Sequence, residues 1–164
     1  MGKILFYGVF CLWVVSCKRE KGQEIEVVVA DTFFSVDSLP KPAPINDRAM
    51  AVINDWQEFK NLETTFESLY RVDNREDLTL VIEDLIEKQK MLEASRYPET
   101  FNKPQIKSRQ KVFKTYVLKT KGNLAYRVGV KESTLEMVTA YNAFRNQFSV
   151  LVNSALDTNL ILDQ

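Results

Sequence analysis

The residue types that most often carry catalysis or bind metals are scarce in this chain. Its 164 residues contain no histidine, and the two cysteines, Cys11 and Cys17, both lie close to the N-terminus. Histidine is the commonest general base and metal ligand, so serine triads and histidine-containing zinc sites are excluded. No glycine-rich phosphate loop or G-x-S-x-G turn occurs. We therefore expect no cofactor, no metal and no enzymatic activity.

The cysteine thiols lie in or next to a short apolar segment. Lys3 is followed by an uninterrupted apolar run, residues 4–15, and then by Ser16, Cys17 and a charged stretch that begins at Lys18. A helix needs about 20 apolar residues to span a bilayer, and this run is shorter. The order of a cation, an apolar run, a small residue and a polar continuation indicates a cleaved export signal.

Residues Val14, Val15, Ser16 and Cys17 resemble the lipobox of bacterial lipoproteins, which has an aliphatic residue three positions before the cysteine and a small one just before it. The resemblance covers residues 1–17, and Val14 stands where leucine is commoner. It implies diacylglyceryl transfer to the Cys17 sulfur, removal of residues 1–16 and acylation of the new amino group. Each buried acyl CH₂ contributes about 0.8 kcal/mol, so two or three chains bind a membrane firmly. Lys18, in place of an aspartate, favours an outer-membrane anchor and a periplasm-facing domain.

Residues 17–45 are expected to form the lipidated N-terminus and an extended tether. No helical period occurs there, and Pro40, Pro42 and Pro44 favour a polyproline-like path. The β-branched and aromatic residues of 25–36 are unusual for a solvated spacer. We favour a strap that lies against the domain, because an exposed run of this kind is prone to aggregate. The alternative is a strand that adds to the sheet edge of a partner.

A run of cations without anions lies in the second half of the chain, between Phe101 and Lys131. Five of its residues form a possible face for an anionic partner: Lys107, Arg109, Lys111, Lys114 and Lys119. The whole chain has 22 cations and 22 anions, so only a local patch could attract such a partner. We favour the simpler interpretation, that these cations lie beside acidic helices earlier in the chain. The alternative is a platform for anionic lipid headgroups, acidic glycans or an acidic protein; nucleic acid is not expected.

Apolar residues recur every three or four positions after Pro44, which predicts amphipathic helices at 46–71, 74–95, about 103–123 and about 133–156. The expected caps are Asn46, a box of Asp73 and Glu76, a box of Asn102 and Gln105, and a box of Ser133 and Glu136. Pro98 is expected to end the second helix and Pro104 to occupy the first turn of the third. The predicted buried stripes are Ile53, Trp56, Phe59, Leu62, Phe66 and Leu69; Leu78, Val81, Ile82, Leu85, Ile86 and Leu92; Ile106, Phe113, Val117, Thr120 and Leu124; and Leu135, Val138, Tyr141, Phe144, Phe148, Leu151, Val152, Ala155 and Leu156.

Four helices of similar length with short connections predict an all-α fold, arranged as an antiparallel up-down-up-down four-helix bundle. The alternative is a longer, kinked three-helix arrangement. The predicted organisation is a signal peptide at 1–16, a lipidated tether at 17–45 and a helical domain at 46–164. We expect a lipid-anchored interaction or scaffold module of the bacterial cell envelope, with an envelope protein or an anionic glycan or lipid as possible partner. A carrier of a small apolar ligand is the alternative, and a hydrolase without histidine is a third hypothesis.

Overall fold

A computed structural model describes the backbone of residues 33–162 and the side chains of residues 33–154. The predicted signal peptide, Cys17 and residues 25–32 of the strap lie outside the described residues, as do the side chains of Ala155 and Leu156. Helices are the only regular secondary structure of the described residues, which contain no strand. This confirms the prediction of an all-α fold. Its α-helices are α2 (Asp47–Ile53), α3 (Gln57–Ser68), α4 (Arg75–Ala94), α5 (Pro104–Ala125) and α6 (Lys131–Leu162). Short 3-10 helices lie at Val36–Ser38, Leu69–Arg71 and Glu99–Phe101.

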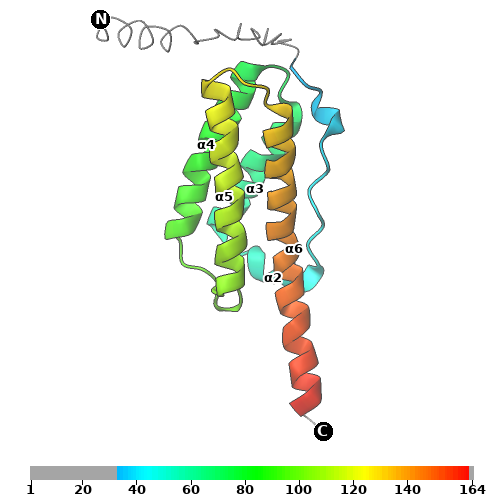
Figure 1. Ribbon diagram of the computed structural model, residues 1–164. Helices are drawn as coiled ribbons and strands as arrows, with labels where there is room; N and C mark the ends of the chain where they lie inside the picture. Colours follow the sequence, from blue (N-terminus) through cyan, green and yellow to red (C-terminus); the bar gives the residue numbers. More distant parts are fainter. Residues whose placement is uncertain (1–32, 163–164) are drawn as a thin grey trace, which may run out of the picture.

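Each long helix packs against the next one along the chain. Contacts join α3 to α4, α4 to α5 and α5 to α6, while α2 packs against both α3 and α6. The loop from α4 to α5 lies at the opposite end of the domain from the loop between α5 and α6 (Figure 1). The C-terminal part of α6 extends past the ends of the other helices. Among the helices of residues 33–162, none combines the length and the apolar character needed to cross a membrane.

The first predicted helix is divided in two. Residues 46–71 were expected to be one helix, but α2 ends at Ile53 and α3 begins at Gln57. Trp56, with φ −100° and ψ 86°, leaves the helical region between them, although its side chain is buried as predicted. The break lets α2 pack against α6 while α3 packs against α4. The break could not be predicted because the helical spacing of apolar residues continues across it.

Two helices begin with an asparagine cap. The backbone N–H of Ala49 donates to Asn46 Oδ1 at 2.8 Å, as predicted for α2. The cap of α4 was predicted one residue too early, since Asn74 rather than Asp73 accepts a hydrogen bond, from the Asp77 N–H at 2.8 Å. Asparagine and aspartate both cap well, so the sequence alone did not decide between adjacent positions.

The predicted capping boxes of the third and fourth helices are wrong. Lys103 precedes α5 and makes no capping hydrogen bond with its side chain, whereas Pro104 does occupy the first turn. Helix α6 begins at Lys131, so Ser133 lies inside the helix, and its hydroxyl donates to the Val130 carbonyl at 3.1 Å. A serine inside the first turn can bond back to the preceding carbonyl in this way instead of capping.

The helix ends also differ from the predicted positions. Helix α4 ends at Ala94, four residues before Pro98, and α5 continues past Gly122 to Ala125. A Schellman motif ends α5, in which the Val128 N–H donates to the Asn123 carbonyl at 2.9 Å. Arg127 takes the left-handed position of this motif, with φ 54°, where glycine is usual.

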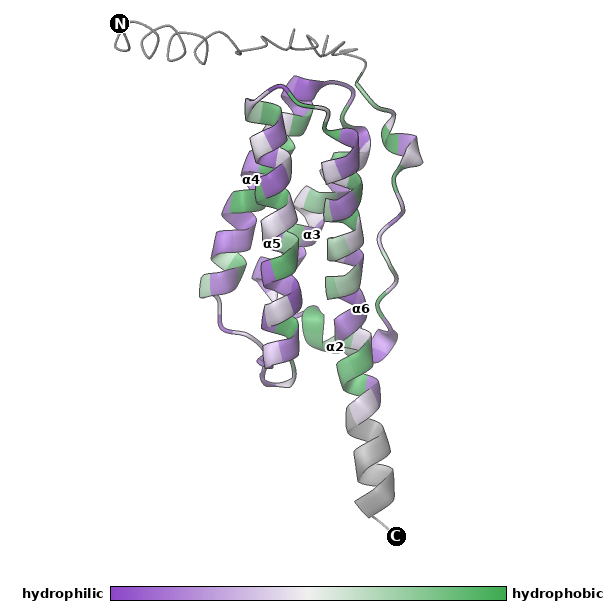
Figure 2. Cartoon of the chain, viewed as in Figure 1, coloured by the Kyte–Doolittle hydropathy of each residue, from purple (hydrophilic) through white to green (hydrophobic). Residues whose placement is uncertain are grey.

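Aromatic rings form much of the core. The Phe148 ring lies in contact with the rings of Trp56, Phe59, Phe101 and Phe144 at centroid distances of 4.7 to 6.2 Å. Each helix carries hydrophobic and hydrophilic residues together (Figure 2), and the predicted stripes of α3, α4 and α5 are buried or partly buried. These contacts confirm that the apolar spacing marks the inward faces.

One predicted core residue of α6 is on the surface. Leu135 is 41% exposed, while the neighbouring Thr134, Met137 and Val138 are buried. The buried face of α6 is therefore formed by residues before and after Leu135, and Leu135 itself lies outside that face. The rest of the predicted stripe, from Val138 to Phe148, is buried where the prediction placed it.

Candidate functional site

The C-terminal half of the basic helix α5 is paired with acids of its neighbours. Lys114 Nζ lies 2.6 Å from Glu93 of α4, and Lys121 Nζ lies 3.5 Å from Glu83 of the same helix. Lys119 pairs with Glu136 of α6, and this hydrogen bond raises the pKa of Lys119. The two pairs with α4 agree with the simpler interpretation of the basic run, which placed these cations beside acidic helices earlier in the chain, whereas Glu136 lies on the later helix α6.

The N-terminal half of α5 differs. Within the described part of the chain, no carboxylate forms an ion pair with Lys107, Arg109 or Lys111, and all three side chains are exposed. Lys107 Nζ instead lies 5.2 Å from the centre of the Tyr97 ring, a cation–π contact. The five residues of the predicted face thus form two groups, of which only Lys107, Arg109 and Lys111 keep charges without a partner carboxylate.

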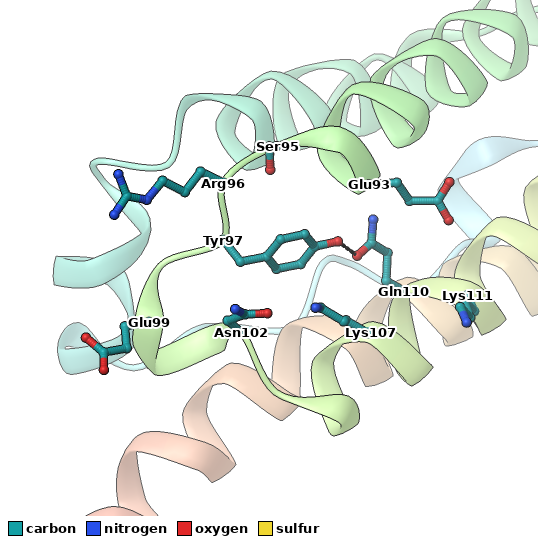
Figure 3. A pocket seen from close by; sticks show the side chains of 9 residues that line it. All are labelled: Glu93, Ser95, Arg96, Tyr97, Glu99, Asn102, Lys107, Gln110 and Lys111. Atoms are coloured by element: carbon teal, nitrogen blue, oxygen red, sulfur yellow. Dashed lines mark hydrogen bonds between the residues drawn. The ribbon is translucent and has the colours of Figure 1, made fainter.

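Lys107 and Lys111 line a cleft of about 720 Å³ between the end of α4, the following loop and the start of α5. Figure 3 shows its lining, which consists of Glu93, Ser95, Arg96, Tyr97, Glu99, Asn102, Lys107, Gln110 and Lys111. All nine residues are polar, charged or carry a phenolic hydroxyl, so the cleft suits a polar ligand. We call it the Lys107–Lys111 cleft.

A second hollow, of about 590 Å³, lies on the other side of the same loop. Arg96, Tyr97 and Glu99 line both hollows. The second one is completed by residues around the α2–α3 break, among them Asp55, Trp56 and Glu58. The loop after α4 therefore separates the polar Lys107–Lys111 cleft from a second hollow of mixed polar and apolar lining.

Tyr97 covers a buried pair of glutamines. Its hydroxyl donates to Gln110 Oε1, and burial raises the pKa of Tyr97, so the hydroxyl keeps its proton. Gln110 is only 1% exposed, and Gln89 Nε2 donates to the Gln110 backbone carbonyl at 3.5 Å. Gln110 Nε2 and Gln89 Oε1 have no hydrogen-bond partner among the described residues. A buried donor and a buried acceptor are thus left unsatisfied beneath the cleft, at a cost of about 1–3 kcal/mol for each group.

Contacts behind Tyr97 fix the loop that carries it. The Trp56 ring lies 4.8 Å from the Tyr97 ring, and Trp56 Nε1 donates to Ser95 Oγ at 2.9 Å. The Ser95 hydroxyl in turn donates to the Leu92 carbonyl at 2.9 Å, at the end of α4. The indole that interrupts the first helix therefore also positions one wall of the cleft.

Residues 33–46 form a strap along the domain. Phe33, Phe34 and Val36 are partly buried against the core. Asn142 of α6 binds the strap backbone twice: its Oδ1 accepts from the Ala43 N–H at 2.7 Å and its Nδ2 donates to the Lys41 carbonyl at 3.1 Å. Of the predicted strap, residues 25–36, the structure describes 33–36, which pack on the domain as expected, and the contacts with the domain continue to residue 46.

Two further polar residues of α6 bind the strap. Arg145 Nε donates to the Ala43 carbonyl at 2.7 Å, and Ser149 Oγ accepts from the Asn46 N–H at 3.1 Å. The same guanidinium is paired with Glu63 of α3. Together, Asn142, Arg145 and Ser149 form a row one turn apart along α6 that binds main-chain groups, a set of contacts that we call the strap clamp.

Burial perturbs the acids around the strap clamp. Desolvation raises the pKa of Glu63 above its ordinary value, and Arg145 opposes this by its charge and its hydrogen bond. Desolvation also raises the pKa of the almost fully buried Tyr141, whose hydroxyl accepts a hydrogen bond from Arg145 at 3.5 Å. Both shifts favour the neutral forms of these side chains.

Sequence reasoning did not identify Arg96, Tyr97, Gln89 or Gln110 as site residues. Gln110 carried a signal, since it interrupts the buried stripe between Ile106 and Phe113 at helical spacing. Residues 33–154 contain no cluster of three or more potential metal ligands among Cys, His, Asp and Glu. Searches against protein-family models, curated proteins and solved structures found no match to this chain.

Proposed function

We propose that the protein is a lipid-anchored interaction module of the bacterial cell envelope, held in the outer membrane through acyl chains on Cys17 and facing the periplasm. The support for the anchor is the lipobox-like sequence Val14–Cys17 and the cation that follows it. The domain binds an envelope component of polar character rather than carrying out catalysis.

The strap clamp is the observation that carries this proposal. The strap begins at the end of the domain that holds the α5–α6 loop, and the loop between α4 and α5 lies at the other end (Figure 1). Residues of that loop and of the adjoining helix ends line the Lys107–Lys111 cleft. Residues 18–32 separate the proposed anchor from Phe33 and span at most about 50 Å when fully extended. In an anchored domain held by the strap clamp, the tether therefore joins the domain at the end opposite the cleft.

We infer that α3, α4, α5 and α6 form an antiparallel up-down-up-down four-helix bundle, to which α2 and the strap are added. The support is that each of these helices packs against its neighbour in sequence and that the connecting loops alternate between the two ends. A rigid bundle of this kind keeps the anchored end and the cleft apart.

A polar partner is favoured over the apolar ligand of the alternative hypothesis. The interior contains aromatic rings in mutual contact, such as those of Phe59, Phe144 and Phe148. The larger of the two described hollows is lined by polar and charged residues and Tyr97, and the other by polar and apolar residues together.

Metabolic labelling with an alkyne fatty acid tests the anchor. The full-length chain is expressed in a bacterium with a lipoprotein pathway, as wild type, Cys17→Ala and the matched control Cys11→Ala. We expect label on the wild type and on Cys11→Ala, and none on Cys17→Ala, because only Cys17 follows the lipobox-like residues. Equal labelling of both alanine variants refutes the anchor.

Cross-linking in intact cells followed by purification in mild detergent tests the binding role. We expect a polar envelope component to be recovered with the wild type and to be lost when Lys107 and Lys111 are reversed in charge. Recovery of a stoichiometric apolar small molecule and no such component would favour the carrier hypothesis instead.

A further inference from the structure

We propose that the Lys107–Lys111 cleft is a binding site for an acidic saccharide, whose carboxylates lie against Lys107 and Lys111 and one of whose hydroxyls reaches the Gln110 amide. This inference rests on the proposed function, because it names the class of partner that the domain binds at the end opposite the strap.

The first observation is that the two cleft lysines have no carboxylate partner among the described residues. Lys107 and Lys111 lie one turn apart on α5, where like charges repel by a few tenths of a kcal/mol. Farther along the helix Lys114, Lys119 and Lys121 each pair with an acid, but no described carboxylate pairs with Lys107 or Lys111. An anionic ligand in the cleft supplies the missing counter-charge to both.

The remaining charges of the cleft agree with an anionic ligand. Arg96 adds a third cation to the lining, and Glu93 is already engaged by Lys114 at 2.6 Å. Glu99 is the one acid of the cleft lining without a described ion pair. The positive charges available to a ligand thus exceed the negative ones.

The second observation is the unsatisfied pair of buried amide groups. Gln110 Oε1 accepts from Tyr97, but Gln110 Nε2 has no acceptor among the described residues. A ligand hydroxyl in the cleft can accept from Gln110 Nε2 while the Tyr97 hydroxyl keeps its bond to Oε1, because a hydroxyl both accepts and donates. A bare carboxylate can also accept from Nε2, but the lining holds the acceptors of Glu99 and Asn102 beside its cations, so a ligand that carries hydroxyls as well as charge bonds to more of the cleft.

The shape and position of the cleft favour a saccharide over a membrane surface. The cleft is a concave space between a loop and a helix, into which a chain of sugar rings fits and a flat bilayer does not (Figure 3). It also lies by the α4–α5 loop, at the end of the domain opposite the start of the strap.

Calorimetric titration of the full-length chain in an uncharged polyoxyethylene detergent tests the proposal. The probe is trigalacturonate, and the matched neutral probe is maltotriose. We expect trigalacturonate to bind and maltotriose to bind at least about tenfold more weakly, since a charge-assisted hydrogen bond contributes more than a neutral one. Raising the salt concentration is expected to weaken trigalacturonate binding.

Two double variants separate the cleft from the general charge of α5. Lys107→Glu with Lys111→Glu reverses the two cleft lysines, whereas Lys103→Glu with Arg109→Glu makes the same change of net charge at exposed positions outside the cleft lining. We expect at least about a tenfold loss of affinity from the first and less than a threefold change from the second. Circular dichroism and the melting temperature of each variant check that the fold is kept.

Several results overturn the proposal. These are no binding of trigalacturonate, equal binding of maltotriose, or an equal loss in both double variants. Binding to vesicles with anionic lipids that the cleft variant alone abolishes would assign the lysines to a membrane surface instead. The labelling of Cys11→Ala and Cys17→Ala is independent of this titration, so a failed anchor and a failed saccharide site give different results.

Discussion

Replacing Arg145 with methionine is expected to destabilise the protein mainly by leaving the Glu63 charge without a partner. The two side chains are 13% and 18% exposed, so their ion pair is largely shielded from water. Removing one partner of a buried pair costs about 3–5 kcal/mol, and the remaining exposure places this case near about 3 kcal/mol. Loss of the hydrogen bond from Arg145 Nε to the Ala43 carbonyl adds about 1 kcal/mol.

A second substitution separates the two causes. Glu63→Gln removes the charge that Arg145→Met leaves unpaired, while the hydrogen bond to the strap stays lost. The double variant is therefore expected to recover about 2 kcal/mol of the free energy of unfolding relative to Arg145→Met alone. A double variant no more stable than Arg145→Met would refute the assignment of the loss to the stranded carboxylate.

Urea unfolding followed by circular dichroism at 222 nm measures these differences. With a slope of about 2 kcal/mol per molar urea, a loss of about 4 kcal/mol lowers the midpoint by about 2 M, and the second substitution restores about 1 M. Tyr70→Phe is a control for the strap, since it removes a hydroxyl that donates to the Pro40 carbonyl at 2.5 Å but strands no charge.

The effect of Arg145→Met is also expected to depend on pH. Burial raises the pKa of Glu63 in the folded state, and Arg145 opposes that rise. Without Arg145 the folded-state pKa is higher still, so the folded protein holds the proton more tightly than the unfolded chain. Stability from this group is then present below about pH 4.5 and is lost as the pH rises through the folded-state pKa. A penalty that is the same at pH 4 and pH 7 would contradict this account.

Three further predictions follow from single residues. Phe148→Ala removes a fully buried ring from the aromatic core and is expected to lower the free energy of unfolding in urea by about 3–5 kcal/mol. The control Leu80→Ala, at a 66% exposed position, is expected to lower it by less than about 0.5 kcal/mol. Similar losses of stability in the two variants would contradict the packing described. Because burial raises the pKa of Tyr141, the folded protein keeps this proton above pH 10 while the unfolded chain loses it, so stability is expected to fall with pH above 10, and to fall less steeply in Tyr141→Phe. Asn142→Ala is expected to speed amide exchange at Ala43 by about tenfold or more, since it removes the acceptor of that N–H. Exchange measured by mass spectrometry is easily assigned to Ala43 because the prolines on both sides carry no amide proton. An unchanged rate would mean that the strap clamp does not hold the segment.

Most of the inward-facing residues could be predicted from the sequence because burial on a helix follows from local spacing. Phe59, Phe113 and Phe148 each stand at helical spacing from the other apolar residues of their own helix. A residue on such an apolar face is buried whichever helix covers it. The same local logic found Asn46 as a cap and Pro104 in a first turn. It misplaced the boxes at Asn102 and Ser133 because α5 and α6 begin directly after Lys103 and Val130, which do not cap a helix with their side chains.

The candidate cleft could be predicted only in part. The basic run pointed to Lys107 and Lys111 but did not separate them from Lys114 and Lys119, since all are cations on one helix. Their difference depends on whether Glu93 or Glu136 on a neighbouring helix lies opposite each lysine. Helix order and rotation decide that, and neither is visible in the period of a single segment.

The sequence alone determined the all-α class, the inward faces of the helices and the absence of histidine chemistry, because these follow from composition and from spacing within one turn. The tertiary structure decided the break at Trp56, the strap clamp at Asn142 and the cover of Tyr97 over Gln110. Each of these depends on hydrogen bonds or ring contacts between residues 13 to 101 positions apart in the chain. Such pairs are chosen by which surfaces the folded helices bring together, and no local pattern records that choice.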